Sequence, residues 1–112
     1  MLFCLTADYT PQALVASREN PTNRKEAAGN LVEAAGGKLI QFYHTGSTGP
    51  GALVIFDVPD PQMASAIMGV TVSSGTIHNA RMTRLHTVEE VAEIRQKAAQ
   101  IRSSYKPMGQ AG

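Results

Sequence analysis

The sequence has few of the residues that mark disulfide-rich, metal-binding or nucleic-acid-binding proteins. Its 112 residues include one Cys and no Trp, and charged residues make up 17 %, below the typical ~25 %. A single Cys excludes an intrachain disulfide framework and a metal site built on several Cys residues. A net charge of +1 at pH 7 argues against binding of nucleic acid through a basic surface.

Long hydrophobic runs are scarce as well. No stretch approaches the roughly 18 apolar residues that a membrane span requires, so no membrane partner is expected. The first residues, MLFCLTAD, have no basic residue before a short apolar run that ends at Asp8. This pattern favours a strand over a signal peptide. We therefore expect a cytoplasmic protein, and a lone reduced Cys agrees with that location.

The residues that are present predict one folded domain. A chain of this length is typical of a single domain, and 43 % hydrophobic residues match the level of folded proteins. We expect the domain to span residues 1–102. A small, polar and flexible tail is expected to follow it at residues 103–112.

Capping residues mark the predicted helix starts. Thr10-Pro11 predicts a short helix over residues 11–18, because a Thr side chain accepts from free N–H groups and Pro tolerates the first helical position. Further helix starts are predicted by three other caps, namely Asn23 with Glu26, Asp60 before Pro61, and the capping box Thr87-x-x-Glu90.

Short runs of β-branched and aromatic residues predict strands over residues 2–7, 38–45, 52–58 and 76–86. The element order is therefore β-α-β-β-α-β with an additional C-terminal helix. This is the ferredoxin-like order, an α+β fold in which helices cover one face of a four-stranded antiparallel sheet. We expect the strands to lie in the order 4-1-3-2.

The third predicted strand is apolar on both faces. Val54, Phe56 and Val58 alternate with Leu53 and Ile55. The face of an antiparallel sheet that carries no helices is ordinarily polar, so a second copy of the chain is the simplest cover for it. We therefore expect a homodimer or a higher homo-oligomer.

Several sequence blocks resemble the GYD family, small bacterial proteins of the dimeric α/β-barrel group. The resemblance rests on Arg24 with the Ala-rich segment that follows it, on Tyr9-Thr10, and on the blocks Ala34–Thr45, Leu53–Asp60 and Arg81–Glu90. The family's Gly-Tyr-Asp motif is replaced here by GSTGPGA over residues 46–52. The resemblance implies the ferredoxin-like fold and a back-to-back sheet dimer, and it implies little about activity.

Side chains alternate between the two faces of a strand, and this alternation places a set of polar side chains on the sheet face opposite the predicted helices. If this face encloses a cavity between two sheets, its residues are candidates for binding a small, acidic or phenolic molecule. The alternative is an Asp8–Arg81 ion pair within a polar dimer seam. The candidate ligand-binding residues, with His44 as a possible base, are Thr6, Asp8, Gln41, Tyr43, His44 and Arg81.

For the His residues, the Gly-rich segment and the single Cys, the sequence favours structural roles over catalytic or ligand-binding ones. His44, His78 and His86 have no helical pairing and no Cys partner, so no metal site is predicted. The Gly-rich segment 46–51 joins two predicted strands, which indicates a hairpin loop and not a phosphate-binding loop. Cys4 lies within a predicted strand, where a free Cys is usually a small buried residue. No cofactor motif is present.

Three functions remain open at this point. The first is an oligomeric protein that binds a small organic ligand between sheets. The second is a cofactor-free oxygenase or isomerase, with His44 or Asp8 as the nearest acid–base candidates. The third is an assembly module without a ligand. The sequence does not decide whether the protein is an enzyme.

Overall fold

The computed structural model describes residues 1–47 and 49–110. Thr48 of the predicted hairpin loop and residues 111–112 of the predicted tail lie outside the described residues. The elements, in chain order, are β1 (Leu2–Tyr9), α1 (Pro11–Glu19), α2 (Arg24–Ala34), β2 (Lys38–Thr45), β3 (Gly51–Asp57), α3 (Pro61–Ser73), β4 (Ile77–Leu85), α4 (Val88–Ile101) and a 3-10 turn at Arg102–Ser104.

The helices begin at the predicted caps. Thr10 Oγ1 accepts from the amide of Ala13 at 3.0 Å, and Asn23 and Asp60 make the equivalent contacts at the starts of α2 and α3. Thr87 and Glu90 form both halves of a capping box at the start of α4. These bonds satisfy N–H groups that would otherwise have no partner in the first helical turn.

Within the described residues, β1 to β4 form one antiparallel sheet in the order β2-β3-β1-β4. The predicted ferredoxin-like order and strand arrangement are confirmed. Two register shifts interrupt the strand pairing, one between Leu39 and Gln41 on β2 and one opposite Thr6 and Asp8. Asn79 lies beside the second shift with a φ of 52°, a conformation that Asn tolerates better than most residues.

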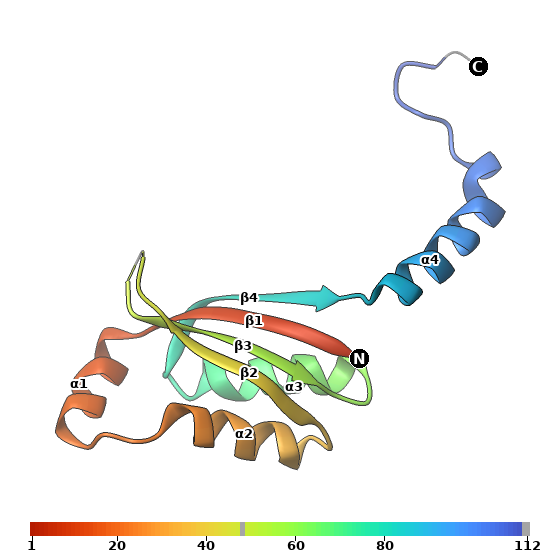
Figure 1. The fold of residues 1–112 in the computed structure, drawn as a ribbon. Coiled ribbons are helices and arrows are strands. Elements are labelled where there is room, and N and C mark those ends of the chain that lie inside the picture. Colours follow the sequence, from red (N-terminus) through yellow and green to blue (C-terminus); the bar gives the residue numbers. More distant parts are fainter. Residues whose placement is uncertain (48, 111–112) are drawn as a thin grey trace.

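The core lies between the sheet and two helices. Figure 1 shows α2 and α3 on one side of the sheet, with α1 beyond the end of β1. Phe56 is fully buried, and it stacks on Phe3 with the ring centroids 6.0 Å apart. From the helices, Val32, Ala64 and Ile67 complete this layer. The opposite side of the sheet, called the open face below, carries no helix.

The last helix stands apart from this core. Figure 1 shows α4 leaving the end of β4 and extending away from the sheet. None of its residues, all of which the structure describes, is buried, and Ile94 and Ile101 are 45 % and 69 % exposed. The molecule therefore measures 64 × 32 × 23 Å.

Within the described residues, no helix combines the length and the apolar character needed to cross a lipid bilayer.

Candidate functional site

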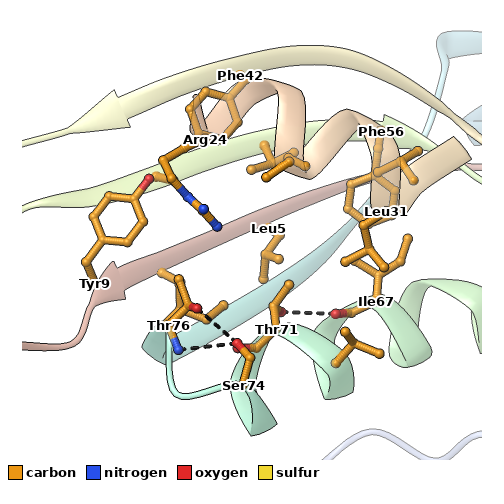
Figure 2. A pocket seen from close by; sticks show the side chains of 18 residues that line it. Leu5, Tyr9, Arg24, Leu31, Phe42, Phe56, Ile67, Thr71, Ser74 and Thr76 are labelled. Atoms are coloured by element: carbon orange, nitrogen blue, oxygen red, sulfur yellow. Dashed lines mark hydrogen bonds between the residues drawn. The ribbon is translucent and has the colours of Figure 1, made fainter. Parts of the chain in front are cut away.

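A cavity of about 160 Å³ lies between the sheet and the helices α2 and α3. Its walls come from alternate positions of β1 and β3 and from the inward faces of the two helices. Most of these side chains are apolar, among them Leu5, Leu31, Phe42, Val54, Phe56 and Ile67. We call this space, shown in Figure 2, the inner cavity.

The hydroxyl groups at the α3 end of the inner cavity are engaged by their own backbone. Thr71 Oγ1 donates to the carbonyl oxygens of Ile67 and Met68 at 3.0 Å each. Ser74 Oγ donates to the carbonyl of Thr71 at 2.7 Å. These helix-closing bonds occupy the donor of each hydroxyl. Tyr9 and Arg24 also line the cavity, and Arg24 keeps guanidinium N–H donors that no such bond occupies.

Tyr9 is placed by the end of β1. Its amide donates to the carbonyl of Pro50 at 2.9 Å, which ties the strand end to the β2–β3 loop. The next residue, Thr10, caps α1 and also donates through Oγ1 to the carbonyl of Gly75 at 2.6 Å. The backbone is thus held on both sides of Tyr9, and its phenol lies along the rim of the inner cavity (Figure 2).

Arg24 is the first residue of α2 and reaches the same rim. In Figure 2 its guanidinium is directed into the space beside the Tyr9 hydroxyl. Nη1 donates to Thr22 Oγ1 at 3.0 Å. Among the described residues, no carboxylate lies within ion-pair distance of Arg24. Every other residue lining the inner cavity is uncharged.

A second cavity, of about 460 Å³, opens beside the first and is called the outer cavity. It shares Tyr9, Arg24 and Thr76 with the inner cavity and extends along α1 to His44. His44 Nδ1 lies 3.3 Å from the Tyr9 hydroxyl. Its ring also meets the ring of Phe42 edge-on, with centroids 5.2 Å apart. Tyr9, Arg24 and His44 therefore form a polar rim between the two cavities.

Burial raises the pKa of the Tyr9 phenol, and the positive charge of Arg24 opposes this rise. The phenol is consequently protonated near neutral pH. In that state it donates one hydrogen bond and can accept another. It can donate to His44 Nδ1, or accept from a protonated Nδ1 and donate to a ligand instead.

Five of the six predicted site residues share the open face. Thr6 and Arg81 are direct partners in the β1–β4 pairing, and Gln41 and Tyr43 pair with Ile55 and Leu53. Asp8 pairs with Gly51 and accepts a hydrogen bond from Asn79 Nδ2 at 3.2 Å. In the described residues, the ion pair considered between Asp8 and Arg81 is not formed.

These five residues do not converge within one chain. Tyr43 lies on β2 and Arg81 on β4, which are the two edge strands of the sheet. Three strand spacings separate the edges, about 14 Å in all. His44, the sixth residue, pairs with Ala52 and reaches Tyr9 on the helix-covered side. The structure thus brings together Thr6 and Arg81, but it separates His44 from the other five.

Comparison with known proteins identifies the family. The GYD domain matches residues 3–94. The chain belongs to the GYD domain family. No curated protein matches the sequence.

Among the solved structures that match this GYD domain in fold is an enzyme. It is a 5-chloro-2-hydroxyhydroquinone dehydrochlorinase from Burkholderia phenoliruptrix, in complex with 2,5-dihydroxybenzoquinone. The two chains superpose with a TM-score of 0.55 at 16 % sequence identity, over 80 % of this chain and 97 % of the other. At this identity the similarity supports the shared fold.

Two rim residues of the GYD domain, Tyr9 and Arg24, are absent from the set predicted from sequence. Tyr9 ends a strand, and Arg24 begins a helix after a separate helix and a loop, so no sequence spacing connects them. The sequence nevertheless contains one feature that indicates a space beside Arg24. Arg24 begins an Ala-rich segment whose first two inward positions, Ala27 and Ala28, are small. Small inward residues leave space beneath a helix.

Within residues 1–47 and 49–110, no three His, Cys, Asp or Glu side chains are grouped so that they could hold a metal ion. Cys4 is half-buried on β1, and burial raises the pKa of its thiol. A raised pKa keeps the thiol protonated and lowers its nucleophilicity.

Proposed function

We propose that this GYD domain binds a small organic molecule in the inner cavity. The observation that carries the proposal is a mainly apolar space of about 160 Å³ with a phenol and a guanidinium, those of Tyr9 and Arg24, at its rim. An apolar cavity of roughly 150 Å³ is large enough to hold benzene. A ligand with one ring would contact the apolar walls and direct its polar substituent to the rim.

The fold comparison supports a ligand of this size. The dehydrochlorinase of similar fold was solved with 2,5-dihydroxybenzoquinone, a single ring with oxygen substituents. A ring of that kind has the two properties that the inner cavity provides for, an apolar body and a hydrogen-bonding edge. We therefore propose phenolic or acidic monocyclic compounds as the ligand class.

We further propose that the protein is a homo-oligomer built through the open face, and that it acts in the cytoplasm. Leu53 and Ile55 are only partly covered on this face, and Tyr43 is 56 % exposed. A second sheet packed on them would remove apolar surface from water. In this arrangement Thr6, Gln41 and Arg81 belong to a polar seam between subunits, where one copy can bring Tyr43 toward Arg81 of the other.

A cofactor-free oxygenase or isomerase is the second candidate function. The contact that favours it is the 3.3 Å approach of the Tyr9 hydroxyl to His44 Nδ1 at the cavity rim. Such a pair could take a proton from a bound phenol and return it. Oxygen uptake or isomerised product with a hydroquinone, lost in His44→Gln, would establish this function. Binding without turnover would leave the protein as a ligand-binding protein.

Filling the inner cavity tests the primary proposal. Ala28 lines the cavity from α2, and Ala34 is exposed on the same helix. We expect 2,5-dihydroxybenzoquinone to shift the amide NMR resonances of cavity residues in the unmodified protein and in Ala34→Leu. Ala28→Leu should weaken this binding at least about tenfold, because the larger side chain occupies the ligand space.

Either of two results would overturn the proposal. If the quinone and other monocyclic phenols shift no cavity resonance at millimolar concentration, the chain is an assembly module without a ligand. If Ala28→Leu and Ala34→Leu bind the compound equally well, the compound is not bound in the inner cavity, and the proposal is likewise overturned.

A further inference from the structure

The cavity rim carries a positive charge, and this charge bears on which ligand the cavity would bind. Among the described residues, Arg24 is the only charged side chain that lines the inner cavity, and no Asp or Glu lines the outer cavity. A guanidinium has five N–H donors, and Thr22 accepts one of them. Along the described chain no carboxylate neutralises this cation.

From this we propose that the inner cavity selects a monocyclic aromatic anion, with its oxyanion bound by Arg24. The inference rests on the proposed function and adds the charge of the ligand. A planar oxyanion matches the planar guanidinium and can accept two parallel N–H bonds from it. Low polarity on the cavity side strengthens this attraction, because the apolar wall excludes water from one side of the pair.

Tyr9 and His44 complete the oxyanion site. The Tyr9 hydroxyl lies on the rim beside Arg24 and 3.3 Å from His44 Nδ1. With an anion present, Tyr9 donates its proton to the ligand oxygen and accepts from Nδ1–H of His44. The anion would then receive bonds from Arg24 and Tyr9, while its ring rests among apolar side chains. Binding should therefore select the form of His44 that carries a proton on Nδ1.

The test compares benzoate with benzamide, which has the same shape and no charge. We expect benzoate to bind the unmodified protein at least about tenfold more tightly, which is the size of effect that a hydrogen-bonded charge pair provides. Arg24→Gln should reduce benzoate affinity to that of benzamide, whereas Arg24→Lys should retain part of the difference. 4-Nitrophenolate shows whether a phenolate oxygen serves as well as a carboxylate.

Arg18→Gln is the matched control. Arg18 is exposed on α1, lines neither cavity, and its removal changes the net charge by the same amount. It should leave benzoate affinity unchanged. Equal losses in Arg18→Gln and Arg24→Gln would overturn the inference, since the effect would then come from net charge. An unchanged melting temperature in both variants shows that folding is not the cause.

The outcomes also separate the two proposals. If benzoate and benzamide bind equally and Ala28→Leu weakens both, the cavity binds ligands but does not select an anion, so this inference is overturned alone. If neither compound binds at millimolar concentration but 2,5-dihydroxybenzoquinone does, this inference is overturned alone, and if the quinone does not bind either, the proposed function falls with it. A His44 15N spectrum that does not change on addition of benzoate would contradict the predicted role of Nδ1–H.

Discussion

Glu90 accepts hydrogen bonds from the end of β4 and from the start of its own helix. Its Oε2 accepts from Arg84 Nη2 at 2.6 Å, and its Oε1 accepts from the amide of Thr87 at 3.1 Å. The hydrogen bond from the Thr87 backbone, followed by that from Arg84, lowers the pKa of this carboxyl from 4.5 to about 2. Arg84 also lies 5.6 Å above the Phe3 ring, so Glu90 is linked to the edge of the core.

This lowered pKa predicts a pH-dependent contribution to stability. The folded-state pKa of Glu90 is below its unfolded value, so the contribution is present above pH 4.5 and is lost as pH falls toward 2. We expect the free energy of unfolding of the unmodified protein to decrease over this range. In Glu90→Gln the decrease should be smaller, as measured by urea titrations at several pH values.

Glu89→Gln is the control for this prediction, because Glu89 is an exposed neighbour in the same helical turn. Its pH profile should follow that of the unmodified protein. If Glu90→Gln shows the same acid dependence as the unmodified protein, then the contacts of Glu90 do not stabilise the folded state.

At the residue scale, sequence reasoning identified caps better than the cavity rim. Thr10, Asn23, Asp60 and Thr87 were predicted because each acts on amides a few positions away. The approach of Tyr9 to His44 depends on how two strands end against one loop. Such a contact is set by tertiary structure, and local spacing carries no information on it.

The β2–β3 hairpin contains a glycine, Gly51, at a position that has no room for a side chain. Gly51 is buried between β1 and β2, and a Cβ at this position would overlap the carbonyl oxygen of Ala7. That oxygen belongs to the backbone of a paired strand and has little room to move. The residue is therefore required by the close approach of two strands.

We expect Gly51→Ala to destabilise the protein by about 1–3 kcal/mol, since either β1 or β3 must shift to admit the methyl group. Gly46→Ala is the control, because a Cβ at Gly46 meets no atom within 4 Å. Its effect should stay within about 0.5 kcal/mol. Thermal and urea unfolding measure both. Equal stability of the two variants would contradict the close packing of β1 and β3 at this point.

At the scale of elements, alternation of residues predicted most of the strands, because a sheet covered on one face requires it. Strand β3 begins at Gly51, one residue before its predicted start. The register shift between Leu39 and Gln41 was not predicted, although it decides which side chains of β2 face the helices. A bulge depends on the pairing of two strands, and the sequence of one strand does not reveal it.

For the whole molecule, the open face predicts the oligomeric state. We expect light scattering at micromolar concentration to give at least twice the mass of one chain. Ile55→Lys should shift the mass to that of a monomer, because Ile55 lies on this face opposite Cys4 and Gln41. A buried Lys without a partner would oppose association.

Val72→Lys provides the comparison, since Val72 is 44 % exposed on α3 and belongs to the helix side of the molecule. It should leave the mass unchanged. A single-chain mass for the unmodified protein would refute association through the open face, and so would dissociation caused equally by both substitutions.

At this scale the sequence predicted the fold but not the inner cavity. The order of elements allows few sheet topologies, so the strand order followed from it. The alternation of polar residues along the strands points only to the open face. The inner cavity lies on the other side of the sheet, beneath small residues of α2 such as Ala27 and Ala28. An empty space is a property of packing, and the identity of the residues alone does not reveal it.

The exposure of helix α4 makes the stability of this helix depend on whether another surface covers it. The capping box and the Arg84–Glu90 ion pair anchor its first turn, while its apolar residues Ile94 and Ile101 face solvent. A helix of this length is marginal in water without packing. Its backbone amides should therefore exchange with deuterium before those of the sheet whenever nothing covers Ile94 and Ile101. Slow deuterium exchange in α4 would therefore show that another surface packs against this helix.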